Sequence, residues 1–191
     1  MTSFSIIGTG NMATAIGSVL TSGGSDVSFI SRGEVGSAPL ADVVIFATPY
    51  GAVASIVEAY GAQLDGKTVV DISNPLNFET FDSLVVAAGS SATAELQALL
   101  PASRVLKAFN TNFAATLATK TVGEVATTVL IAGDSDDAKN ELIAAIEAGG
   151  VGALDAGSLQ RAHELEAIGF LQLTLAVGEK LGWNAGFAVV R

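Results

Sequence analysis

Short apolar runs alternate along the chain with longer segments in which apolar residues recur at helical spacing. The runs are rich in Val, Ile and Phe and predict β-strands. They cover residues 4–7, 27–31, 43–47, 68–72, 104–109, 127–132 and 153–155. Helices are predicted over residues 11–23, 52–60, 93–100, 137–148 and 159–181. This alternation predicts an α/β fold with a doubly wound, mostly parallel sheet that is covered on both faces.

One connection is too short for a complete doubly wound sheet. Residues 32–42 would have to hold a helix and a third strand, but Gly33, Gly36 and Pro39 disfavour a helix there. Fully extended, this stretch reaches about 36–40 Å, enough to return along a strand of ~17 Å and cross two strand spacings of ~5 Å. We therefore expect the third strand to be missing.

The first predicted strand leads directly into a glycine turn, "GTGNMA" at residues 8–13, which opens the first helix. In this G-x-G-x-x-G/A pattern Gly8 makes the tight turn, Gly10 lets the backbone approach a ligand, and Ala13 keeps the helix near the sheet. A turn without a ligand is the alternative. Its place between strand and helix favours a Rossmann-type site in which backbone N–H groups hold a pyrophosphate. The predicted contacts are Gly8, Thr9, Gly10, Asn11 and Met12.

The end of the second predicted strand indicates which dinucleotide binds. A site that prefers NAD places Asp or Glu here, to accept from the ribose 2'-hydroxyl. This chain has Ser31 and Arg32, and a guanidinium pairs well with a phosphate, so the sequence predicts NADP. Glu34 is unfavourable for a phosphate, and an ordinary loop arginine is the alternative for Arg32.

Two further strands end in loops at the edge of the sheet where ligands bind in this architecture. Ala47, Thr48 and Pro49 follow one strand, and Asn74 and Pro75 follow the next. We expect both loops to contact the cofactor, although either proline could serve only as a turn residue.

Composition excludes several kinds of chemistry. With half of its 191 residues hydrophobic, the chain is expected to form one domain, with residues 156–191 as a helical extension. A net charge of -10 with only nine Lys and Arg argues against nucleic acid as a partner. The chain has no Cys and a single His, so no metal site is expected. No run approaches the about 18 apolar residues of a membrane span and no basic segment precedes the first strand, so we expect a cytoplasmic location.

Additional motifs occur at residues 47–49 ("ATP"), 73–76 ("SNPL"), 107–114 ("KAFNTNFA") and 155–166 ("DAGSLQRAHELE"). With the glycine turn and "SR" at 31–32, they make the chain resemble the NADPH-dependent oxidoreductases whose named members reduce the deazaflavin coenzyme F420. Related domains occur in membrane ferric reductases and pyrroline-carboxylate reductases. The resemblance implies that NADP lies across the strand ends with a planar acceptor against its nicotinamide. It places Asn110, Thr111, Asn112 and Ala114 beside the nicotinamide.

Hydride transfer between two flat rings depends on proximity and orientation, so no catalytic acid or base is predicted. The Tyr-x-x-x-Lys pair of many ketone reductases does not occur, because neither Tyr50 nor Tyr60 has Lys four residues later. The surroundings of His163 suggest a helix start that faces solvent or a subunit. Lys107 either marks a sheet edge or approaches the ligand, and the Asn110 amide could bond the nicotinamide carboxamide.

The sequence therefore predicts an NADP(H)-dependent oxidoreductase whose acceptor is F420, a flavin, a ferric chelate or an imine. The alternative is an NADP-binding redox-sensing or regulatory protein without turnover. The last helix has apolar residues at Leu165, Ile168, Leu171, Leu175 and Val177 and is apolar almost all round. Such a helix must be covered on more than one side, so we expect a homodimer.

Overall fold

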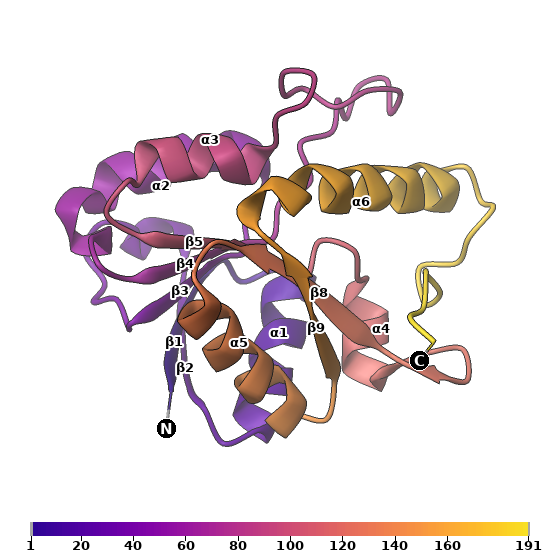
Figure 1. Cartoon of the computed structure of the whole chain (residues 1–191), viewed down its shortest axis with the longest axis horizontal. Coiled ribbons are helices and arrows are strands. Elements are labelled where there is room, and N and C mark those ends of the chain that lie inside the picture. The colour runs from indigo at the N-terminus through magenta and orange to yellow at the C-terminus, as the bar shows by residue number, and fades with distance from the viewer. Residues whose placement is uncertain (1, 191) are drawn as a thin grey trace.

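The computed structural model describes residues 2–190, and its centre is a seven-stranded sheet (Figure 1). The strands in this sheet are β1 (Ser3–Ile7), β2 (Asp26–Ile30), β3 (Val43–Phe46), β4 (Thr68–Asp71), β5 (Arg104–Lys107), β8 (Thr128–Gly133) and β9 (Gly152–Gly157). They lie in the order β2-β1-β3-β4-β5-β8-β9. The first five are parallel, β8 runs antiparallel to β5, and β9 is parallel to β8. The predicted Rossmann-type, mostly parallel sheet is confirmed.

The second crossover is as short as predicted. β2 lies at the edge of the sheet, and the next strand along the chain, β3, pairs with β1 on its other side. Between them the chain makes only one 3-10 turn, η1 (Arg32–Glu34). The strand that a complete doubly wound sheet places beyond β2 is therefore absent from the described part of the chain, as predicted.

Helices cover both faces of the sheet (Figure 1). One face carries α1 (Asn11–Ser22), α4 (Ala114–Thr119) and α5 (Asp136–Ala148). The other carries α2 (Val53–Tyr60), α3 (Ala92–Leu99) and α6 (Ala162–Val177). Three short 3-10 helices, η2 (Tyr50–Ala52), η3 (Gly61–Leu64) and η4 (Leu159–Arg161), complete the connections. No helix within residues 2–190 is long and apolar enough to cross a membrane.

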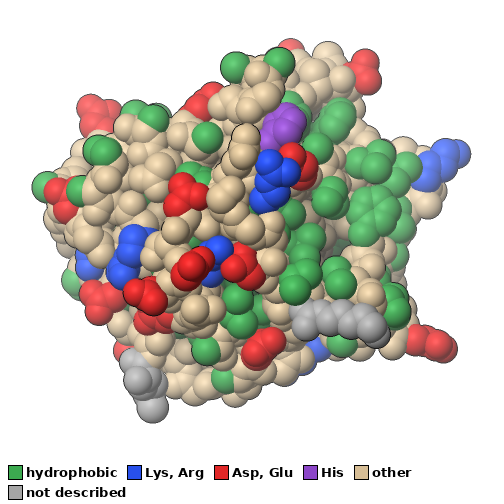
Figure 2. Space-filling model, viewed as in Figure 1, with side chains coloured by type: hydrophobic (Ala, Val, Ile, Leu, Met, Phe, Trp, Pro, Cys, Tyr) green, Lys and Arg blue, Asp and Glu red, His purple; other side chains and the backbone are tan. Residues whose placement is uncertain are grey.

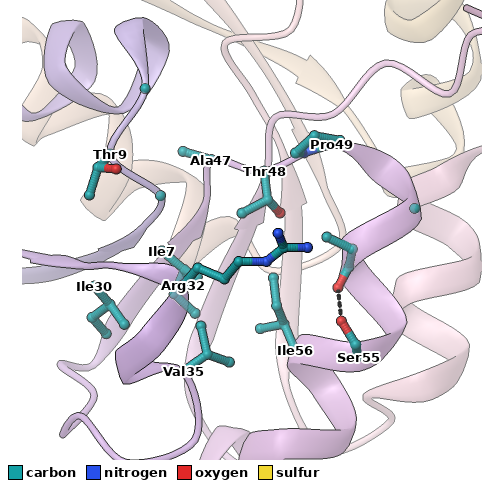
Figure 3. A pocket seen from close by; sticks show the side chains of 14 residues that line it. Ile7, Thr9, Ile30, Arg32, Val35, Ala47, Thr48, Pro49, Ser55 and Ile56 are labelled. Carbon is teal, nitrogen blue, oxygen red and sulfur yellow. Dashed lines mark hydrogen bonds between the residues drawn. The ribbon is translucent and has the colours of Figure 1, made fainter.

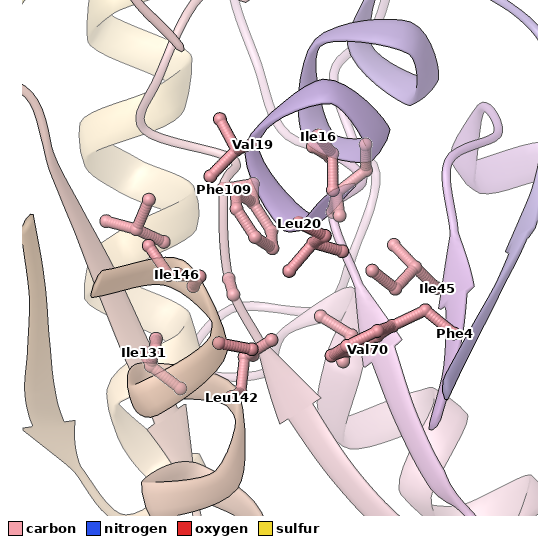
Figure 4. Packing of buried hydrophobic residues seen from close by; sticks show 14 of the residues in the cluster. Phe4, Ile16, Val19, Leu20, Ile45, Val70, Phe109, Ile131, Leu142 and Ile146 are labelled. Carbon is pink, nitrogen blue, oxygen red and sulfur yellow. The ribbon is translucent and has the colours of Figure 1, made fainter. Parts of the chain in front are cut away.

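Alternate residues of each central strand enter two hydrophobic layers. In β3, Val43 and Ile45 face α1, whereas Val44 and Phe46 face α2 and α3. A strand buried on both faces reads as a continuous apolar run, which is why these strands are visible in the sequence. Figure 4 shows the layer between the sheet, α1 and α5, with Phe4, Ile16, Val19, Leu20, Ile45, Val70, Phe109, Ile131, Leu142 and Ile146.

Three predicted boundaries are wrong. The strand predicted over residues 104–109 ends at Lys107, because Phe109 adopts a left-handed conformation with φ of 63°. The final helix was expected to continue to Leu181 but stops at Val177, where the N–H groups of Lys180 and Leu181 both donate to the carbonyl of Leu175. The same helix begins at Ala162, three residues after its predicted start, because residues 159–161 form the 3-10 helix η4. All other predicted ends lie within two residues of the structure.

Helix α4 and the small hairpin of β6 (Thr121–Val122) and β7 (Val125–Ala126) were not predicted. Each is too short to show a hydrophobic period. They matter for the site because α4 begins directly after the loop that follows β5.

Candidate functional site

The glycine turn between β1 and α1 leaves the start of α1 open. Gly10 is the N-cap residue, no side chain caps the helix, and its first turn has no acidic residue. The N–H groups of this turn and the positive end of the helix dipole therefore remain available to an anion. This is the arrangement that the sequence predicted for a pyrophosphate.

The two glycines of the turn have different roles. Gly8 has φ of 130°, and a Cβ atom there would lie 2.3 Å from the carbonyl oxygen of Ala47. The fold itself therefore requires glycine at position 8. A Cβ atom on Gly10 would meet nothing within 4 Å, so the space beside it is open to a ligand.

Two cavities lie on either side of the start of α1. The larger, of about 750 Å³, is lined among others by Gly8, Thr9, Gly10, Arg32, Thr48 and Pro49. The smaller, of about 410 Å³, is lined among others by Asn74, Asn110, Asn112, Phe113, Leu173 and Trp183. Thr9 and Gly10 belong to the larger and Asn11 and Met12 to the smaller, so the helix start separates the two.

Arg32 is the one charged residue among the described residues that line either cavity. Figure 3 shows its guanidinium group extended into the larger cavity toward Thr48. The Oγ1 atom of Thr48 is buried and has no hydrogen-bond partner among the described residues. A cation and an unpartnered hydroxyl thus face the same space, as a phosphorylated ribose would require.

Ser31 is bound to Glu34 in this structure. Its N–H donates to Glu34 Oε2 over 2.9 Å, and its hydroxyl donates to the same oxygen. These two hydrogen bonds lower the pKa of Glu34, the hydroxyl contributing most, so that the side chain is anionic at neutral pH. Ser31 does not line the larger cavity, so a phosphate in that cavity would contact Arg32 first.

Two asparagines form a reciprocal amide pair in the smaller cavity. Asn110 Nδ2 donates to Asn74 Oδ1 over 2.9 Å, and Asn74 Nδ2 donates to the carbonyl of Asn110 over 3.1 Å. Asn110 Nδ2 also donates to the carbonyl of Leu165 in α6 over 2.8 Å. The Oδ1 atoms of Asn110 and Asn112 are buried without a partner among the described residues. Free acceptors of this kind suit the N–H groups of a carboxamide.

A buried ionic cluster lies beneath this amide pair. Lys107 Nζ is 2.9 Å from Asp71 Oδ2 and 2.9 Å from Glu166 Oε1, and all three side chains are at most 1% exposed. Lys107 also donates to the carbonyl of Ser73. Burial raises the pKa of Asp71, but the charge and hydrogen bond of Lys107, together with a hydrogen bond from the backbone N–H of Ser73, lower that pKa by more, so the net shift is downward.

The cluster corrects the interpretation of Lys107. β5 lies between β4 and β8, so Lys107 does not mark a sheet edge, and it lines neither cavity. Glu166 instead links the sheet to two helices, because it also accepts from the N–H of Ala92 over 3.0 Å at the start of α3. The cluster therefore fixes α6 and the loop after β4 against the sheet.

Most of the predicted contact residues come together around the two cavities. Those that line the larger are Gly8, Thr9, Gly10, Arg32, Ala47, Thr48 and Pro49, and those that line the smaller are Asn11, Met12, Asn74, Asn110, Asn112 and Ala114. Ser31, Pro75 and Thr111 lie outside both linings. The carbonyl of Pro75 accepts from Val85 N, and that of Thr111 accepts from Gln172.

Sequence reasoning missed the aromatic part of the smaller cavity. Phe113, Leu173 and Trp183 line it, and Trp183 is the single tryptophan of the chain, which was the one available signal.

His163 is half-buried at the start of α6, where its Nδ1 lies 2.9 Å from the carbonyl oxygen of Ser90. Within residues 2–190 no three His, Asp or Glu side chains are grouped to hold a metal ion.

No family model matches the chain. It is 29% identical over 166 residues to the F420-dependent NADP reductase of Methanocaldococcus jannaschii, a match that covers 85% of this chain and 74% of that protein. It is 37% identical over 127 residues to the Metalloreductase STEAP3 of Rattus norvegicus, covering 66% of this chain but only 24% of that protein.

Solved structures share the fold. A protein of Arthrobacter sp. FB24 assigned as an F420-dependent NADP reductase superposes with a TM-score of 0.83 at 22% identity, covering 100% of both chains. An imine reductase of Aspergillus terreus gives 0.65 at 17% identity, covering 94% of this chain and 63% of that one. The predicted resemblance is thereby confirmed: over most of its length this chain is similar to the F420-dependent NADP reductases and has their Rossmann-type fold.

Proposed function

We propose that the protein is an NADP(H)-dependent oxidoreductase that transfers a hydride between the nicotinamide and a small planar acceptor. One observation carries this proposal: two cavities meet at an uncapped helix start, with a cation in one and unpartnered amide oxygens in the other. The name of the relative from Methanocaldococcus jannaschii supports NADP as the cofactor and makes the deazaflavin coenzyme F420 a candidate acceptor.

The cofactor would extend across the start of α1 from one cavity to the other. The adenosine half would lie in the larger cavity, with its 2'-phosphate at Arg32, and the nicotinamide in the smaller. Ser31 would join this contact on release of its hydroxyl from Glu34. The proposed contacts are Gly8 to Met12 for the diphosphate, Ala47, Thr48, Pro49, Asn74 and Pro75 near the riboses, and Asn110, Thr111, Asn112 and Ala114 beside the nicotinamide.

The reduced nicotinamide supplies the hydride, and the residues of this chain bind and orient the two rings. Fixing two reactants about 3–3.5 Å apart removes several kcal/mol from the barrier. No ionisable group lines the smaller cavity among the described residues. Tyr50, which lies in the chain between Pro49 and Gly51 of the larger cavity, donates to Glu95. This hydrogen bond, with burial, raises the pKa of Tyr50 to about 12, so Tyr50 keeps its proton at neutral pH. Positioning therefore accounts for the chemistry without an acid or a base.

We also propose that two copies associate through the outer face of α6, in the cytoplasm, where a soluble cofactor and acceptor would meet. Leu171 is 50% exposed and Val177 45% exposed in α6. Figure 2 shows hydrophobic side chains gathered over α6 and the segment that follows it. A sedimentation mass equal to one chain would contradict the dimer.

The test is an assay of NADPH oxidation with F420, free flavin, a ferric chelate and a cyclic imine, each repeated with NADH. Turnover with at least one acceptor and a preference for NADPH is the expected result. Tight NADPH binding without turnover of any acceptor would instead favour a redox-sensing protein. Absence of NADPH binding would contradict the proposal as a whole.

A further inference from the structure

The smaller cavity combines two kinds of surface. Its polar lining consists of amide side chains, Asn11, Asn74, Asn110 and Asn112, and the rest of its lining is apolar. Of the described residues that line it, none is charged. The amides are accounted for by the nicotinamide half of the cofactor, which leaves the apolar part without a role.

An aromatic pair dominates the apolar part. The ring centroids of Phe113 and Trp183 are 5.0 Å apart and their planes are tilted by 50°. Phe113 is only 8% exposed, whereas Trp183 is 55% exposed, so the indole retains a large free surface. Flat rings stack favourably on such surfaces at centroid separations of about 4.5–7 Å.

The position of Trp183 is set by contacts of its segment with α6. Gln172, itself 1% exposed, accepts from the N–H of Phe187 over 3.1 Å and donates to the carbonyl of Thr111 over 3.2 Å. One buried side chain therefore joins the segment that carries Trp183 to the loop that carries the amides. The aromatic pair and the amide acceptors are therefore held in fixed positions relative to each other.

Charge restricts what can occupy this space. The chain has a net charge of -10, and Arg32, the one cation that lines either cavity, lies in the larger one. An anionic group in the smaller cavity would lose hydration without gaining an ion pair, which is costly. A polycarboxylate iron chelate carries such anionic groups and would incur this loss of hydration, whereas an uncharged ring would not.

Building on the proposed function, we propose that Trp183 and Phe113 form the stacking surface for the acceptor and that the acceptor presents an uncharged flat ring to this cavity. In the balanced reaction the ring gains a hydride from the reduced nicotinamide and a proton from water. An anionic substituent, where there is one, must project out of the cavity into solvent.

The single tryptophan gives a direct measurement, because its emission overlaps the absorption of both reduced nicotinamide and flavin. NADPH should quench Trp183 in the wild-type chain, and lumiflavin, an uncharged isoalloxazine, should quench it further in the presence of NADP. N-acetyltryptophanamide serves as the inner-filter control. Reduction of lumiflavin by NADPH should exceed that of ferric citrate in kcat/KM by about tenfold or more.

Three variants test the stacking role. Trp183→Ala should raise the KM for lumiflavin about tenfold and leave the Kd for NADPH within about twofold, and Trp183→Phe should restore most of the loss. Phe78→Ala, which removes a comparably exposed aromatic (58%) that lines neither cavity, should change nothing.

The outcomes separate this inference from the proposed function. An unchanged KM in Trp183→Ala, equal use of lumiflavin and ferric citrate, or no quenching by lumiflavin would overturn the stacking surface while NADPH binding stands. A wild-type chain that fails to bind NADPH would overturn both.

Discussion

Replacing Lys107 by Met tests whether the buried cluster holds the site together. The substitution keeps the length and most of the volume of the side chain but removes the cation between Asp71 and Glu166. Both carboxylates remain in the interior, at most 1% exposed, without the ammonium that lay 2.9 Å from each. The matched control is Lys67→Met, because Lys67 pairs over 3.7 Å with Asp42, whose side chain is 90% exposed.

The structure sets the magnitude of each loss. Removing one partner of a buried ion pair costs about 3–5 kcal/mol, because the remaining charge stays uncompensated. Here two carboxylates lose one cation, so we expect at least about 4 kcal/mol for K107M, close to the lower end of total protein stability. The exposed pair of Lys67 contributes at most about 1 kcal/mol. With a urea m-value of about 2 kcal/mol per M, the unfolding midpoints should fall by about 2 M and less than about 0.5 M.

The pH dependence has a defined sign. In the wild type the pKa of Asp71 lies below its ordinary value of 3.8, so its stabilising contribution is present above that value and is lost as the pH falls through the folded-state pKa. In K107M the effects of Lys107 disappear and burial remains, which raises the pKa of Asp71. A raised pKa favours the folded state at low pH, so the difference in unfolding free energy between K107M and wild type should shrink from pH 7 to pH 5.

Urea denaturation of the three proteins at both pH values measures these differences. Equal losses in K107M and K67M would refute the reasoning about burial. A K107M deficit that stays constant between the two pH values would refute the reasoning about uncompensated carboxylates.

Four substitutions test the cofactor site, each by fluorescence titration with NADPH and by thermal unfolding. Gly10→Ala should fold normally yet lose most NADPH binding, and normal NADPH affinity in this variant would place the diphosphate elsewhere. Gly8→Ala should be destabilised by about 1–3 kcal/mol, because its Cβ would lie 2.3 Å from a backbone oxygen. Arg32→Ala should weaken NADPH about tenfold or more and NADH by less than about twofold, and equal losses would show that Arg32 does not contact the 2'-phosphate. Gly169→Ala would place a Cβ atom 2.3 Å from the Oδ1 atom of Asn74, so the Kd for NADPH should rise. An unchanged Kd would show that α6 does not position the amide pair.

The central fold could be predicted because its signals are local. The central parallel strands β3 and β4 are buried on both faces, so a run such as Val43 to Phe46 is apolar without interruption. The missing strand followed from the short connection at residues 32–42 and from the Gly and Pro residues within it. The end of β5 did not, since the left-handed conformation of Phe109 is set by its surroundings and not by its own preference.

The candidate site was predictable where a motif carries it and not where distant segments meet. Gly8 and Gly10 were placed from their spacing, and the structure assigns one to the fold and leaves open space beside the other. The contact of Phe113 with Trp183 depends on how the chain after α6 returns to the sheet. The burial of Lys107 likewise depends on Glu166, which no local pattern connects to it.

The crossover from β2 to β3 is short, but it still provides a cation to the part of the site proposed for the 2'-phosphate. Because no strand lies beyond β2 in the described part of the chain, η1 follows β2 immediately and brings Arg32 and Val35 to the wall of the larger cavity. The hydrogen bonds between Ser31 and Glu34 close this turn, so an anionic carboxylate lies within one turn of Arg32, the one cation that lines the cavity within residues 2–190. Discrimination between NADPH and NADH therefore depends on the difference between two opposing exposed charges. Since salt screens such charges strongly, the preference for NADPH over NADH should weaken as the ionic strength rises.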